Sequence, residues 1–212
     1  MKLLQKILED PGSRPFALWQ ALQPTSDLKR DGDQLRVDIP AGTMLQRRWT
    51  RVVPQEQAVE GEDAADSPAS APLALSSTDT SPSATQPLYF QCKRCSNVGP
   101  EAAARAFVQG PTPLTVVLCE NRLQPSDYAT VLTHELVHVY DVTQLRLNLR
   151  DCESLAYSEV RAAAQAECVN NPDPEDCWKR TARRATQNLF PYQGASCVHR
   201  VWKQAVADAR PG

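Results

Sequence analysis

The segment that most constrains the fold is a helix that has to be buried, residues 131–140, with the sequence VLTHELVHVY. Apart from two histidines and one glutamate, its residues are uncharged or apolar, so a helix here lacks the charged face of a surface helix. The residues Pro-Ser-Asp at 125–127 precede it and are typical of the start of a helix. The sequence therefore predicts a buried helix that follows Asp127 and runs to about Val142.

This helix carries a candidate metal site. His134 and His138 are four residues apart, so both imidazoles lie on one face and can reach a single ion. Glu135 can take the proton of a water molecule whose pKa zinc lowers to ~7, which is the chemistry of peptide hydrolysis. The alternative is a buried helix whose two histidines are satisfied by ordinary hydrogen bonds. Since two of only three histidines occur here, the sequence favours one Zn²⁺ ion.

A catalytic zinc ion needs a third protein ligand. The acidic residues and the histidine that follow the motif are candidates: Asp141, Asp151, Glu153, Glu159 and His199. Asp141 is better suited to contact a metal-binding histidine than to bind the metal itself, because its side chain is short and lies on the same helix as the two histidines. Glu159 is favoured because its helical neighbours are all apolar, namely Leu155, Ala156, Ala162 and Ala163. A buried carboxylate there needs a cation, which is either the metal or an arginine such as Arg161 or Arg150.

The developing negative charge on the substrate needs hydrogen-bond donors as well. Tyr140, Tyr157 and His199 are possible donors, and the sequence does not choose among them.

The remaining pattern predicts an α+β fold that is mostly helical, with a small sheet. Apolar spacing predicts a helix at residues 3–10, which Pro11 and Gly12 end, and a short one at 15–22. Strands are expected at 88–90 and 114–119, the second being a β-branched run. Further helices are expected at 153–168, where Ala and Glu are frequent, after Asp176 and after Ser196.

Residues 26–87 are expected to be an insertion between an N-terminal helical segment (1–25) and a metallopeptidase domain (88–212). Residues 54–87 contain six acidic residues, no basic or aromatic residue, and much Ala, Ser and Pro. Such a segment cannot bury enough apolar surface to offset the entropy of ordering it, so we expect disorder. Residues 34–53 alternate loosely and fit either strands or more of the insertion.

Charge and hydropathy exclude several classes of protein. The chain has 23 basic and 25 acidic residues, so it lacks the basic excess of nucleic-acid-binding proteins. This also argues against a zinc protease that acts on DNA-bound proteins. No run approaches the ~18 apolar residues of a membrane-spanning helix. The first residues include Glu9 and Asp10 and do not resemble a secretory signal.

Two segments together resemble a known family: THELVHVYD at 133–141 and SEVRAA at 158–163. The family is that of the mitochondrial inner-membrane metallopeptidase that processes ATP synthase subunit a and assists assembly of its membrane sector. The resemblance extends to FQCKRC (90–95), TVVLCENRL (115–123) and AECVNN (166–171). It covers most of residues 1–25 and 88–212. Tyr157 and Ala205 stand where the family pattern leads us to expect cysteines.

The resemblance implies that His134 and His138 bind zinc, that Glu135 is the catalytic carboxylate and that Glu159 belongs to the site. It implies a zincin-like fold in which a second helix crosses the catalytic helix. It also implies a peripheral protein on the intermembrane-space side of the inner membrane. The expected substrate is the N-terminal segment of a mitochondrially made ATP synthase membrane subunit. The alternative is an assembly chaperone whose zinc site is structural or vestigial.

The seven cysteines leave at least one thiol unpaired within the chain. Cys92 and Cys95 with Cys119 could belong to a structural zinc site or a redox pair. Structural disulfides fit an oxidising intermembrane space better. We therefore expect structural roles for the family-like cysteines, which are Cys92, Cys95, Cys119, Cys168 and Cys177. Cys152 and Cys197 are further candidates, and the connectivity stays open.

Overall fold

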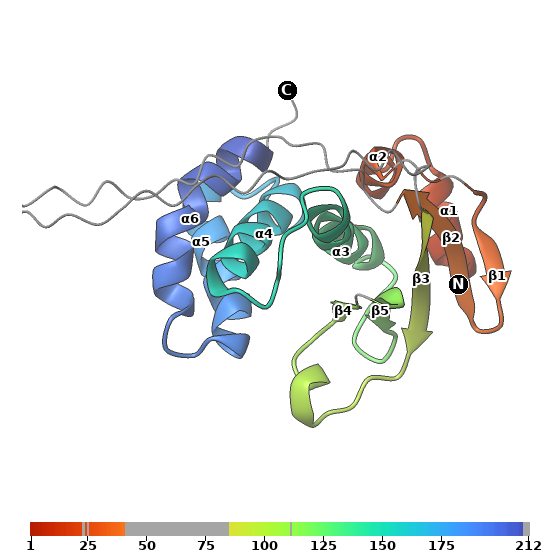
Figure 1. Ribbon diagram of the computed structural model, residues 1–212, viewed down its shortest axis with the longest axis horizontal. Coiled ribbons are helices and arrows are strands. Elements are labelled where there is room, and N and C mark those ends of the chain that lie inside the picture. Colours follow the sequence, from red (N-terminus) through yellow and green to blue (C-terminus); the bar gives the residue numbers. More distant parts are fainter. Residues whose placement is uncertain (23, 25, 41–84, 111, 210–212) are drawn as a thin grey trace, which may run out of the picture. The chain divides into compact units, whose positions relative to one another are not determined.

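Helix α3 (Tyr128–Thr143) lies between a β-sheet and a group of three helices (Figure 1). The computed structural model describes residues 1–22, 24, 26–40, 85–110 and 112–209. Ten of the sixteen residues of α3 are buried, His138 and Glu135 among them. The expected buried helix is therefore present, and it packs against the sheet on one side and against the group of helices on the other.

The sheet has five strands in the order β1-β2-β3-β5-β4. The strands are β1 (Lys29–Asp31), β2 (Gln34–Pro40), β3 (Thr85–Lys93), β4 (Ala106–Gln109) and β5 (Leu114–Cys119). β3 and β5 are parallel, whereas the other neighbours are antiparallel. All six residues of β5 are buried, as its β-branched sequence predicts, and β5 is the last strand before α3.

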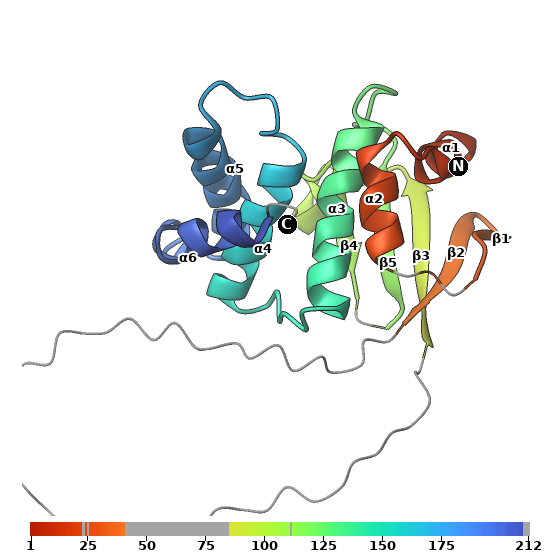
Figure 2. The same cartoon turned by 90° about the horizontal axis from the view of Figure 1, so that it is seen from above.

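One face of the sheet is covered by α1 (Lys2–Glu9), α2 (Arg14–Ala21) and α3 (Figure 2). Their apolar residues form one core with the inward side chains of the strands, such as Val37, Phe90 and Val116. Trp19 of α2 packs against Phe90 with 5.8 Å between ring centroids. This core fixes the position of α3 through Leu132 and Leu136.

The other side of α3 contacts α4 (Cys152–Gln165), which packs with α5 (Pro174–Leu189) and α6 (Gly194–Ala209). These three helices have a core of their own, with Ala156, Val160 and Val206 at its centre. Small alanines on α4 allow close approach of its neighbours. Both views show α4 beside α3 and on the opposite side from the sheet (Figures 1 and 2).

Three disulfides join Cys95 to Cys119, Cys152 to Cys197 and Cys168 to Cys177. Cys92 is a free, half-buried thiol. The expectation of a structural disulfide role therefore fails for Cys92, for a reason of strand geometry. Successive side chains alternate between the faces of a strand. Cys92 packs toward the core under α1–α3, whereas Cys95 and Cys119 lie in a separate cluster with Val117.

The structure bears out the α+β prediction, with a small mixed sheet. It differs at the expected insertion, because residues 29–31, 34–40 and 85–87 are strand residues of the sheet. The loose alternation of Leu35, Val37 and Ile39 places these side chains in the core, so this part of 34–53 is a strand. Residues 41–84, which include most of the segment expected to be disordered, lie outside the described residues. The short strands β1 and β4 were not predicted.

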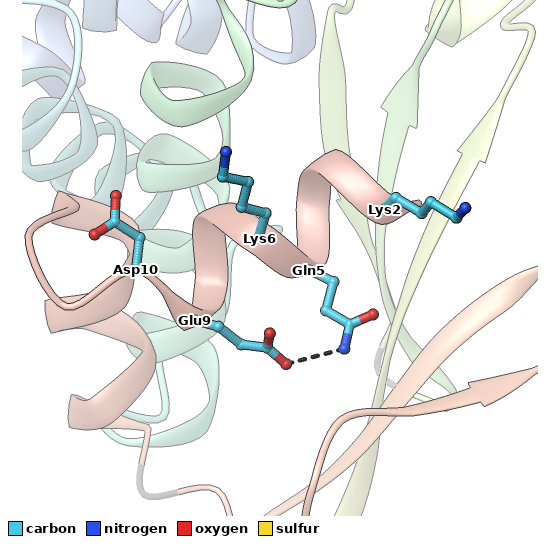
Figure 3. Close-up of a pocket in the computed structure, with 5 residues that line it drawn as sticks. All are labelled: Lys2, Gln5, Lys6, Glu9 and Asp10. Carbon is cyan, nitrogen blue, oxygen red and sulfur yellow. Dashed lines mark hydrogen bonds between the residues drawn. The ribbon is translucent and has the colours of Figure 1, made fainter.

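No helix in the described ranges is both long enough and apolar enough to cross a membrane. A pocket of about 390 Å³ lies on the outer face of α1, lined by Lys2, Gln5, Lys6, Glu9 and Asp10 (Figure 3). Gln5 Nε2 donates a hydrogen bond of 2.9 Å to Glu9 Oε1 there. All five residues come from α1 and its end, and none is a candidate for catalysis or metal binding.

Gly194 provides a test of the packing between α5 and α6. A Cβ atom at Gly194 would lie 2.9 Å from the backbone nitrogen of Gln187 and 3.0 Å from its Cα, so α6 has to shift. We expect Gly194→Ala to lower the free energy of unfolding by about 1–3 kcal/mol. Gly12→Ala is the matched control, because its Cβ meets only Asp10 Oδ1 at 3.5 Å. Urea denaturation that gives equal stabilities for the two variants would contradict the close packing.

Candidate metal centre

Helices α3 and α4 bring His134, His138 and Glu159 together at their contact. One ligand atom from each of the three residues lies within 4.8 Å of the others. His134 Nε2 is 3.3 Å from Glu159 Oε2, and His138 Nε2 is 3.6 Å from Glu159 Oε1. The two imidazole rings are nearly perpendicular, with centroids 4.8 Å apart. Two nitrogen atoms and a carboxylate therefore lie close enough together to hold one metal ion.

His138 is oriented by a chain of buried polar groups. Ser158 Oγ donates to Asp141 Oδ2 at 2.7 Å and therefore accepts from His138 Nδ1, also at 2.7 Å. Arg161 donates to the other oxygen of Asp141. These hydrogen bonds place the proton of neutral His138 on Nδ1 and leave the lone pair of Nε2 facing Glu159.

His134 has a different partner on its outer nitrogen. Its Nδ1 lies 3.1 Å from Glu167 Oε2, and Glu167 is in the turn that follows α4. Arg105 Nη2 is 3.8 Å from the other oxygen of Glu167. Both histidines thus direct Nε2 toward Glu159 while Nδ1 contacts an oxygen atom.

Glu135 points into the protein next to this group. Its side chain is buried, and Oε2 has no hydrogen-bond partner among the described residues. Burial raises the pKa of Glu135 to about 7. A carboxylate with such a pKa can exchange a proton near neutral pH, which suits a general base.

The titration of the histidines differs with their partners. Burial lowers the pKa of His138 to about 4. Burial also lowers the pKa of His134, but Glu159 and Glu167 raise it more, so it lies well above its usual value. Although burial raises the pKa of Glu159, the two histidines lower it more. Without metal, His134 therefore holds a proton between two carboxylates, and a bound cation displaces that proton.

These residues fit a divalent metal ion. The site offers two imidazole nitrogens and one carboxylate, which are ligand types that zinc binds in open catalytic sites. Glu159 Oε2 is buried and makes no regular hydrogen bond, although it faces His134. A cation between the three groups would satisfy this oxygen.

The structure separates Glu159 from the other candidates for third ligand. Asp151 caps α4 by accepting from the Ser154 amide at 2.9 Å, and Glu153 pairs with Arg200 at the surface. His199 is exposed on α6 and does not belong to the His134–His138–Glu159 group. Asp141 contacts Ser158 and Arg161, so it supports His138 through Ser158.

Neither Tyr157 nor His199 is brought into the group as an oxyanion donor. The Tyr157 hydroxyl donates to Asp208 Oδ2 at 2.6 Å, and its ring packs near Arg161. Arg161 is paired with Asp141, so Glu159 is not the carboxylate that it neutralises.

Sequence reasoning missed Ser158, Arg161 and Glu167 as supports of the site. One signal was available for Glu167, because it follows Glu159 by eight residues and Ala163 by four. Residues at this spacing share a helix face, so a continuation of α4 would place Glu167 beside Glu159. For Ser158 and Arg161 no pattern in the sequence distinguishes a contact with α3 from exposure to solvent.

The sequence is similar to those of known peptidases. The sequence profile of the peptidase M76 family matches residues 67–212. Two curated relatives are called mitochondrial inner membrane protease ATP23. The one from Scheffersomyces stipitis is 44% identical over 114 residues, and the one from Candida albicans is 29% identical over 114 residues. Each match covers 45% of this chain and 48% of the relative, so the chain spans about half the length of the relatives it matches. No solved structure matches the chain.

Replacement of Glu159 tests the third ligand. Loss of a residue that only orients a ligand weakens metal binding about 10–100-fold. We expect Glu159→Ala to weaken zinc binding by more than this. Circular dichroism should show that the helices are retained. Glu153→Ala, at the exposed start of the same helix, should bind zinc like the original protein. Full zinc occupancy in Glu159→Ala would mean that another group completes the site.

The raised pKa of Glu135 predicts a pH-dependent stability of the metal-free protein. Between pH 4.5, the usual pKa, and about 7, the unfolded state ionises first, so stability falls as pH rises through this window. The loss is about 3 kcal/mol, since each pKa unit corresponds to about 1.4 kcal/mol. Glu135→Gln should abolish this loss of stability. The free energy of unfolding of the variant should therefore exceed that of the original protein by an amount that grows from pH 4 to pH 8. A constant difference in urea denaturation across this range would contradict the prediction.

Proposed function

Because the chain belongs to the peptidase M76 family, a family of metallopeptidases, we propose that it is a zinc-dependent endopeptidase of the mitochondrial inner membrane. Membership of this family agrees with the resemblance noted in the sequence. The observation that carries the proposal is the convergence of His134, His138 and Glu159 within 4.8 Å, beside the buried carboxylate of Glu135. In this proposal α3 and α4 are the crossed helices of a zincin-like site.

His134, His138 and Glu159 would hold the zinc ion in this proposal. The ion supplies Lewis-acid chemistry, which polarises the carbonyl group of the substrate and lowers the pKa of water. Glu135 accepts the proton of the attacking water and transfers it to the leaving amine. Glu135 suits both steps because it is buried beside the three ligands and its Oε2 has no hydrogen-bond partner among the described residues.

The sheet offers a place for an extended substrate beside the site. β4 is an edge strand that pairs only with β5 in the described part of the chain. It packs against α3, and Arg105 directly before it contacts the Glu167 that binds His134. An unpaired strand edge can form main-chain hydrogen bonds with an extended peptide. This arrangement suits cleavage within a protein chain.

We further propose that the substrate is the N-terminal segment of a mitochondrially made ATP synthase membrane subunit. The protein would act as a peripheral protein on the intermembrane-space side and would also aid assembly. The support is the family resemblance of residues 133–141 and 158–163, together with the name of the two relatives, which assigns them to the mitochondrial inner membrane.

Glu135→Gln distinguishes a peptidase from a chaperone with a structural zinc site. The variant should keep its fold and bind zinc, because Glu135 is not among the three converging ligands. We expect cleavage of the unprocessed ATP synthase subunit to fall by about 10²–10⁴-fold, which is the contribution typical of a general base. The measurement is N-terminal sequencing of the subunit after incubation with the zinc-loaded protein.

Glu153→Gln is the matched control for this experiment, because Glu153 is an exposed glutamate that pairs with Arg200. It should cleave the subunit at the original rate. If Glu135→Gln supports normal ATP synthase assembly in cells that lack the original protein, and neither form cleaves, the chaperone alternative is correct.

A further inference from the structure

The two histidines of the candidate metal centre are supported in different ways. The support of His138 consists of Ser158, Asp141 and Arg161, which are all buried and lie on α3 and α4 themselves. The support of His134 is Glu167, which lies beyond the end of α4 and is only partly buried. Thus the position of Glu167 does not follow from the packing of α3 against α4.

Other contacts hold Glu167 at His134. The next residue, Cys168, is 1% exposed and is joined by a disulfide to Cys177 of α5. The amide of Cys168 donates to the carbonyl of Ala163 on α4 at 2.9 Å. The backbone at Glu167 is therefore tied to both helices. Arg105 lies on the other side of the carboxylate, 3.8 Å from Oε1.

The contact has a defined chemical consequence for His134. A carboxylate accepts hydrogen bonds and donates none, so His134 Nδ1 carries the hydrogen in its contact with Glu167 Oε2. When His134 is neutral, its lone pair is then on Nε2, which faces Glu159 and the point where the three ligand atoms converge. A carboxylate on the outer nitrogen also makes the imidazole a more basic ligand.

We propose that Glu167 is a positioning residue, which fixes the tautomer and orientation of His134 and thereby raises the affinity of the site for its metal. The proposal rests on the metal centre proposed above. It assigns to the turn after α4 a role in metal binding, in addition to the ligands on α3 and α4. Glu167 does not contact the substrate or the metal in this role.

The test compares three forms of the full chain after removal of metal with a chelator. Zinc affinity is measured by competition with a chromogenic chelator. Glu167→Ala should raise the dissociation constant about 10–100-fold. Glu167→Gln should recover part of this loss, because its amide oxygen still accepts a hydrogen bond from Nδ1. Glu175→Ala, at an exposed glutamate that pairs with Lys179 on α5, should bind zinc like the original protein.

A second measurement separates positioning from a purely structural role. With Co²⁺ in place of zinc, the visible absorption bands report the geometry of the ligands. They should shift in Glu167→Ala, and they should be restored toward the original spectrum in Glu167→Gln. An unchanged dissociation constant in Glu167→Ala would overturn the proposal, and so would a weaker affinity with an unchanged cobalt spectrum, since that result indicates a purely structural role.

The outcomes distinguish this inference from the proposed function. If the original protein binds neither zinc nor Co²⁺, the metal centre itself is wrong. If it binds both, and Glu167→Ala binds them equally well, then only the role of Glu167 is wrong. Should Glu167→Ala not fold, comparison of Glu167→Gln with the original protein decides, since a neutral acceptor should still lower the affinity and shift the bands.

Discussion

The contact between α3 and α4 is the interaction on which the candidate site depends. Each helix carries part of the site, and only their packing sets Glu159 between His134 and His138, at 3.3 and 3.6 Å. Two carboxylates are buried there, those of Glu135 and Glu159. Burial of charge is costly unless a cation or a proton compensates it. The fold thus maintains an arrangement that favours metal binding, and hydrophobic packing elsewhere has to hold it together.

Two cores supply that packing, and α3 and α4 are their meeting point. The sheet with α1 and α2 buries one side of α3, while α5 and α6 bury the far side of α4. The Cys152–Cys197 disulfide links the start of α4 to α6, and Cys168–Cys177 links the turn after α4 to α5. Both ends of α4 are therefore covalently tied to the helices behind it. This leaves the face with Glu159 directed at α3.

The residues of the candidate metal centre could be predicted in large part, because the patterns that indicate them lie within a few residues of one another. His134, Glu135 and His138 lie within one helical turn, and the apolar neighbours of Glu159 show that its carboxylate is directed inward. Three supports could not be predicted in the same way, because Ser158, Arg161 and Glu167 obtain their roles from contacts between separate elements. The prediction of a structural disulfide role was wrong for Cys92, which is a free thiol. Its neighbour Cys95 pairs with Cys119 on the opposite side of the sheet.

The sequence by itself determined the buried helix, the motif on it, the α+β class and the main helices, because each depends on hydrophobic periodicity or fixed spacing within a few residues. Only the tertiary structure decided the strand order, the cysteine pairing and the place of residues 29–40 in the sheet. It also decided which acidic residues face the histidines. These features depend on contacts between residues that are far apart in the sequence, and the packing of the whole chain determines those contacts.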